Sequence, residues 1–123
     1  MPYGPGGKWI DDMRTRITKN VEDPDKSIKL LEQVDEMEFV LMELDQNVVD
    51  YYNRLALLDE NYNSTREEFQ KEIDAFNKYR HNAVVKLFEI TVEMKSIAGR
   101  ADWEAISDMD ETLYESWQRS YGS

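Results

Sequence analysis

Apolar residues recur at alternating intervals of four and three through two long stretches of the chain, on either side of a polar turn at residues 59–64. This spacing puts the apolar side chains on one face of a helix and is typical of long helices packed side by side. The first stretch comprises Leu30, Val34, Met37, Leu41, Leu44, Val48, Tyr51, Leu55 and Leu58, and the second comprises Phe69, Ile73, Phe76, Arg80, Ala83, Leu87, Ile90, Met94 and Ile97. The pattern predicts an all-α protein built on a long antiparallel helical hairpin.

Capping and breaking residues set the expected ends of the helices. We expect the two hairpin helices over about residues 25–58 and 64–97, because Pro24 suits an opening turn and Ser64 with Glu67 can form a capping box. Two shorter amphipathic helices are expected over about residues 8–20 and 101–120, the second one following a tight connection at Gly99. The sequence therefore predicts a four-helix, bundle-like fold whose two shorter helices pack at the open end of the hairpin.

The length of 123 residues fits one domain, which we place at residues 8–123 behind a flexible Gly/Pro-rich leader at residues 1–7. That leader is either native or the first mature part of an exported protein behind an added Met, and the second alternative slightly favours the periplasm. The absence of cysteine excludes disulfides and thiolate chemistry but does not identify the compartment.

The charge balance limits the partners of the chain. A formal net charge of −11 disfavours nucleic acid and anionic membranes, because neutralising phosphates requires clustered Lys and Arg. No apolar run approaches the roughly 20 residues that a transmembrane helix needs. We therefore expect neither a nucleic-acid partner nor a transmembrane segment.

The sequence offers no catalytic machinery. His81 is the only histidine, and there is no cysteine, no Gly-rich phosphate loop and no Ser/His/acid spacing. Carboxylates such as Asp74, Asp45 and Glu38 could hold a divalent cation, but a solvated acidic face is the favoured interpretation. We expect no cofactor, no metal and no enzyme activity.

The end of the hairpin near the turn carries more apolar surface than one seam between two helices can bury. A helix over residues 101–120 is roughly 30 Å long, so it reaches only about three-fifths of the way along the hairpin. We expect a protein-binding or dimer surface made of Val49, Tyr52, Leu57, Tyr62, Phe69, Phe76 and Tyr79. Two interpretations compete: a homodimer, which we favour, and a surface that binds unfolded or partner polypeptide.

Arg80 is the one charged residue at a seam position. Folding the hairpin at Asn61 brings it near Glu38 and Asp45, with which it is expected to form an ion pair. Fixing the register of the two helices is the favoured role of this pair, and ligand binding is the alternative.

Residues 62–69 opening a long helix, followed by residues 93–97, a short turn and Asp102-Trp103, resemble the Spy/CpxP-like group of periplasmic stress and metal-response proteins. The resemblance implies a hairpin dimer with a cradle-like surface and ATP-independent chaperone activity. In this chain residues 98–103 stand where that group carries a Leu-Thr-x-x-Gln segment, and the chain is acidic where the group's cradle is basic.

Together these features predict a non-enzymatic binding protein. One hypothesis is an exported holdase-like or envelope stress-response module that binds polypeptide through the apolar hairpin surface. The alternatives are a cytosolic adaptor or assembly subunit that binds one amphipathic helix, and a purely structural homodimer.

Overall fold

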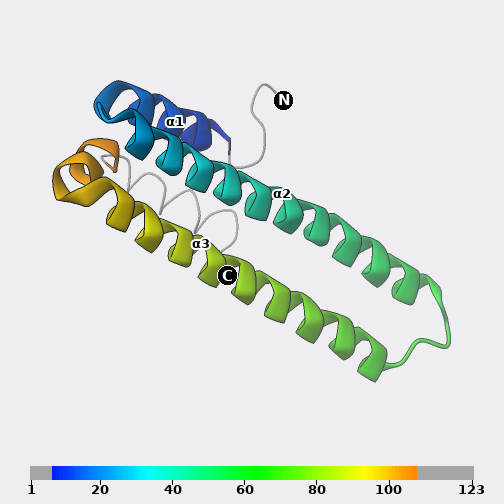
Figure 1. The fold of residues 1–123 in the computed structure, drawn as a ribbon. Helices are drawn as coiled ribbons and strands as arrows, with labels where there is room; N and C mark the ends of the chain where they lie inside the picture. The colour runs from blue at the N-terminus through cyan, green and yellow to red at the C-terminus, as the bar shows by residue number, and fades with distance from the viewer. Residues whose placement is uncertain (1–6, 108–123) are drawn as a thin grey trace.

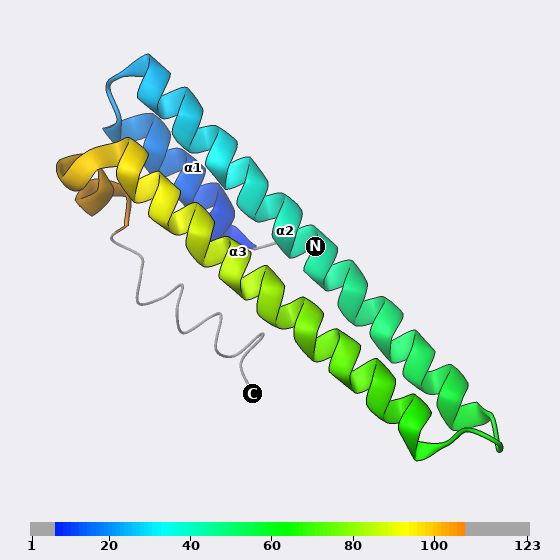
Figure 2. The ribbon, with the colours of Figure 1, turned by 60° about the horizontal axis from the view of Figure 1, so that its bottom comes forward.

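The computed structural model describes residues 7–107, and this part of the chain forms three helices and no strand. These are α1 at Lys8–Asn20, α2 at Pro24–Glu60 and α3 at Arg66–Ile106 (Figure 1). Helices α2 and α3 run antiparallel along each other, and α1 packs against both at the open end of the hairpin, as two views agree (Figures 1 and 2). The all-α class is therefore confirmed for the described residues.

The starts of α2 and α3 are fixed by side-chain caps. The Asp23 carboxylate accepts hydrogen bonds from the backbone N–H groups of Asp25 (3.0 Å) and Lys26 (3.4 Å), and Pro24 occupies the first turn, where no N–H is needed. At α3 the cap is Thr65, which forms a capping box with Glu68. The expected box at Ser64 and Glu67 is one residue off, because the periodicity alone does not distinguish adjacent hydroxyl residues.

The predicted break after Ile97 is seen as a kink at Gly99. This residue has non-helical backbone angles (φ 78°, ψ 169°), so α3 consists of two helical segments that meet at the kink, the second one ending at Ile106. Besides α1, only the first turns of the second expected short helix, up to Ile106, lie in the described part, so the four-helix arrangement is not shown in full. Residues 108–120 of the expected last helix, and residues 1–6 of the expected leader, lie outside the described residues.

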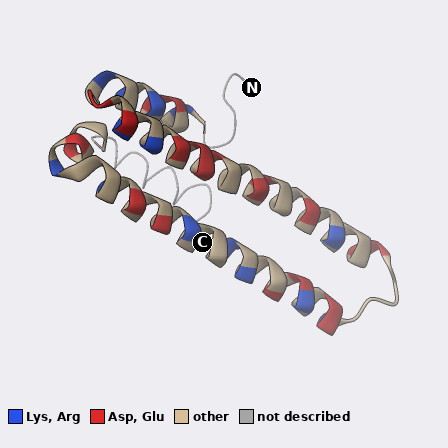
Figure 3. Cartoon of the chain, in the orientation of Figure 1, with Lys and Arg blue, Asp and Glu red and all other residues tan. Residues whose placement is uncertain are grey.

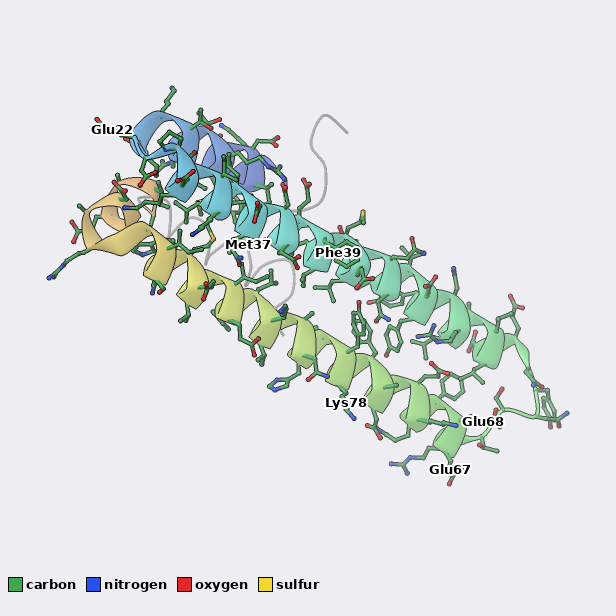
Figure 4. The ribbon with its side chains drawn as sticks, in the orientation of Figure 1. Glu22, Met37, Phe39, Glu67, Glu68 and Lys78 are labelled. Atoms are coloured by element: carbon green, nitrogen blue, oxygen red, sulfur yellow. The ribbon has the colours of Figure 1, made fainter. Side chains whose placement is uncertain are left out.

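The hydrophobic core occupies the proximal part of the hairpin, where α1 supplies a third helix. Its buried side chains are Ile10, Met13, Ile17, Val21, Leu30, Val34, Met37, Leu41, Leu87, Ile90, Met94, Ala98 and Ile106. Figure 4 shows Met37 on α2. Because Leu41 is fully buried, its truncation to Ala should cost about 2–5 kcal/mol of unfolding free energy. The seam predicted from the sequence is thus a true core in this part of the molecule.

Polar contacts link α1 and the kinked end of α3 to α2. The Arg14 guanidinium on α1 donates to Asp35 (2.9 Å) and Glu38 (3.0 and 3.3 Å) on α2. Hydrogen bonds from Arg14 to Glu38 and then to Asp35 raise the pKa of Arg14 above its ordinary value. Near the Gly99 kink, the Lys26 ammonium donates to the Ala98 carbonyl (3.0 Å) and to Asp102 (3.1 Å). The first helix and the kinked end of α3 are therefore both tied to α2.

Candidate functional site

The part of the hairpin near the turn, residues 45–82, differs sharply from the core and is called the distal arm here. Every residue within it is at least partly exposed, whereas fully buried residues extend along α2 as far as Leu44 and along α3 from Ala83 onward. Only α2 and α3 form this arm among the described residues, and α1 lies at the other end (Figure 1). Because no third helix packs on this part of the hairpin in the described structure, the side chains between α2 and α3 stay partly exposed to solvent.

Four of the seven residues predicted for the binding surface are exposed on this arm. The exposed fraction is 53% for Val49, 63% for Tyr52, 67% for Leu57 and 98% for Tyr62. Tyr62 lies in the turn between the helices, and the other three lie on α2. These side chains are available to a partner without any rearrangement of the hairpin.

The other three predicted residues, Phe69, Phe76 and Tyr79, are half-buried on α3. Phe76 stacks on Tyr51 of α2, with ring centroids 4.1 Å apart and planes 8° apart, and Tyr52 lies next to Tyr51 with centroids 5.4 Å apart. The stacked pair of Phe76 and Tyr51 therefore packs between the two helices of the arm, and Tyr52 contacts this pair through Tyr51. A substitution at Phe76 would disturb the arm itself rather than its surface alone.

Polar contacts also shape the arm. Arg54 of α2 donates to Glu72 of α3 at 2.7 Å, which links the two helices. The Asn47 side-chain oxygen is buried without a hydrogen-bond partner in the described structure. Burial, assisted by the negative charge of Glu43, raises the pKa of the Tyr79 phenol. These contacts show that α2 and α3 pack against each other within the arm.

The structure shows a partner for one member of the predicted ion pair of Arg80 with Glu38 and Asp45. Glu38 is engaged by Arg14 of α1, a partner that the hairpin register did not suggest. Arg80 and Asp45 lie on α3 and α2, and their pairing stays a prediction.

Exposed apolar residues also lie outside the predicted surface. On α2 they include Phe39 (52%; Figure 4) and Met42 (49%). Both precede Val49 on the helix. On α3 they are Val85 (40%), Phe88 (60%) and Val92 (64%). Within each group the residues are three or four positions apart, so they share a face of their helix that is not the seam face. This additional helical spacing is the sequence signal that could have identified them.

The charges are unevenly divided between the two long helices (Figure 3). Residues 32–50 of α2 contain seven acids and no base, whereas residues 78–95 of α3 contain four bases and two acids. Within residues 7–107 no group of three or more His, Cys, Asp or Glu side chains is arranged to hold a metal ion. None of the described helices is long and apolar enough to cross a membrane.

Comparison of the chain with family models, with curated proteins and with solved structures finds no match. The functional interpretation therefore depends on the geometry of the distal arm.

Proposed function

We propose that this chain is a non-enzymatic protein-binding module and that the distal arm is its binding surface. The observation that supports this most directly is that no residue of 45–82 is buried, although the arm carries Val49, Tyr52, Leu57 and Tyr62 in exposed positions. Large exposed apolar side chains concentrated in one part of a molecule often mark interaction surfaces.

The exposed residues are well suited to bind polypeptide. Covering Tyr52 or Leu57 completely would contribute on the order of 1.5–3 kcal/mol per side chain. Aromatic side chains such as Tyr52 and Tyr62 often dominate binding energy, because they bring large area with few rotatable bonds. Residues 45–82 contain eight acids and five bases, so the arm favours apolar segments with basic rather than acidic flanks. An exported holdase-like or envelope stress-response role is the form suggested by the Spy/CpxP resemblance.

The test is suppression of aggregation of a chemically denatured client, followed by light scattering at increasing ratios of this protein to client. The protein should suppress aggregation, and Tyr52→Asp with Leu57→Asp should remove most of this effect, because both side chains are exposed on the arm. Ile28→Asp is the matched control, since Ile28 is 55% exposed but lies near the start of α2, outside the arm.

Either of two results would contradict client binding by the arm. One is a wild-type protein that leaves aggregation unchanged. The other is a control variant that loses as much activity as the arm variant while both keep the helical content of the wild type.

A homodimer is the second candidate, and the open seam of the arm favours it. Tyr51 and Phe76 are half-buried, and a second hairpin laid on the same side would complete a four-helix core around them. Light scattering over a wide dilution range, together with a dye that reports exposed apolar surface, distinguishes the candidates. A stable dimer with little dye bound supports self-association, and a monomer that binds dye strongly supports an open surface. Saturable one-to-one capture of a single amphipathic helix would instead identify an adaptor.

A further inference from the structure

Helix α1 shows how this hairpin binds an amphipathic helix. Its side chains Ile10, Met13 and Ile17 recur at i, i+3 and i+7 and are 1%, 7% and 0% exposed. They belong to the same core as buried side chains of α2 and α3, and α1 lies along both helices (Figures 1 and 2). One face of α1 is therefore fully used in binding the proximal part of the hairpin, which is called the α1 docking site here.

Complementary charges accompany this apolar contact. The Arg14 guanidinium of α1 donates to Asp35 (2.9 Å) and to Glu38 (3.0 and 3.3 Å) of α2. Residues 8–20 contain four bases and two acids, whereas residues 32–50 contain seven acids and no base. Helix α1 is thus a basic helix bound to an acidic stretch of α2, and opposite charges favour that contact.

The side of α2 that carries the two carboxylates paired with α1 continues into the distal arm. Seven residues make almost two helical turns, so residues seven positions apart lie on the same side of a helix. Met42 and Val49 lie seven and fourteen positions after the first carboxylate, and Asp45 and Tyr52 lie seven and fourteen positions after the second. Met42, Val49 and Tyr52 are 49%, 53% and 63% exposed. The α1 docking site therefore has a continuation on the arm that no other helix of the described part covers.

The two sides of the arm differ. Arg54 lies two positions after Tyr52, about 200° around the helix, so the seam lies between them. Arg54 donates to Glu72 of α3 at 2.7 Å and bridges the two helices on its own side. The other side extends from Met42 to Leu58, about 24 Å, which is long enough for a helix of 13 residues such as α1. A partner helix is therefore expected on the same side as α1, end to end with it.

We propose that the distal arm binds an amphipathic helix of a partner protein with a basic residue beside its apolar face, on the continuation of the α1 docking site. This inference rests on the protein-binding role proposed above and names the class of partner. Apolar side chains at i, i+3 and i+7 of the partner helix cover Val49 and Tyr52, in the way that α1 covers the proximal seam. Its basic residue lies at Asp45, as Arg14 lies at Glu38 one repeat earlier.

The test uses a synthetic peptide of residues 8–20 with an N-terminal fluorescein, because α1 is the helix whose binding chemistry the structure shows. Fluorescence polarisation follows its binding to the full-length protein. The wild type should bind the peptide saturably, with one peptide per chain. Val49→Asp with Tyr52→Asp should weaken this binding at least tenfold, because both exposed side chains lie on the proposed site.

Ile28→Asp is the matched control and should keep the affinity of the wild type. Ile28 is 55% exposed but lies 21 positions, roughly 31 Å, from Val49 along α2. A second peptide with Arg14→Glu keeps the apolar face and should bind the wild type at least tenfold more weakly than the first. Circular dichroism checks that the protein variants keep the helical content of the wild type.

Three results would overturn the proposal. The first is equal affinity of the wild type and the Val49/Tyr52 variant, which would place the peptide elsewhere. The second is equal affinity of the two peptides. The third is a wild type that binds no peptide, as expected if a second copy of the chain occupies the arm. Suppression of client aggregation without peptide binding would contradict this inference alone, whereas the proposed function fails only if aggregation is also unchanged.

Discussion

At the scale of single residues, the ionisation of Tyr79 makes the unfolding free energy depend on pH. Burial, with Glu43 nearby, raises the pKa of its phenol, so the folded state holds the proton more tightly than the unfolded state does. This stabilising contribution is complete below the unfolded pKa, about 10. It is lost as the pH rises from there through the higher folded pKa, because the unfolded chain ionises first.

We therefore expect the unfolding free energy of the wild type to fall more steeply above about pH 10 than that of Tyr79→Phe, as measured by urea unfolding at a series of pH values. Tyr62→Phe serves as the control, because Tyr62 is 98% exposed and should behave like the wild type. Parallel curves for the wild type and Tyr79→Phe would show that Tyr79 does not contribute.

The pairing of Glu38 shows that the apolar spacing of the two long helices does not predict the partner of a charged side chain. Folding the hairpin brings Arg80 toward Glu38 and Asp45, and that prediction considers only two helices. In the structure Glu38 accepts from Arg14, which belongs to α1. Periodicity identifies the face on which a charge lies, but the partner depends on which helix packs on that face.

At the scale of helices, the start of α3 gives a prediction that separates two adjacent residues. Thr65→Ala should cost about 1 kcal/mol of unfolding free energy, because it removes the acceptor for the Glu68 N–H and breaks the capping box. Ser64→Ala should be close to neutral, since the Ser64 hydroxyl has no hydrogen-bond partner in the described structure. Denaturant unfolding of both variants measures the difference, and equal losses would argue against Thr65 as the cap.

The kink in α3 gives a second prediction at this scale. Gly99 has a φ of +78°, which residues with a Cβ rarely adopt, and no heavy atom lies within 4 Å of the place where a Cβ would be. Gly99→Ala should therefore lower the unfolding free energy by about 1–3 kcal/mol through backbone strain alone. The thermal midpoint followed by circular dichroism tests this, with the exposed helical substitution Ser96→Ala as control. An unchanged midpoint in Gly99→Ala would show that the kink is not required.

For the whole molecule, the contrast between core and distal arm predicts uneven stability. Backbone amides of residues 45–82 should exchange with solvent faster than helical amides of the core, because no buried side chain holds the arm closed. Hydrogen exchange followed by mass spectrometry at two protein concentrations measures this directly. Protection of the arm that rises with concentration would indicate pairing of two hairpins. Uniform protection at low concentration would contradict the two-helix description of the arm.

The sequence by itself determined the helices, the hairpin and the seam residues from Leu30 to Leu44, because helical periodicity, caps and turns depend on neighbours within a few positions. It also pointed to excess apolar surface near the turn. Only the tertiary structure decided that Val49 and Tyr52 are exposed whereas Phe76 is stacked on Tyr51, and that Glu38 pairs with Arg14 of α1. The physical reason is that a periodic pattern fixes which face of a helix is apolar. What covers that face depends on where α1 packs, and α1 lies at the opposite end of the hairpin from the turn.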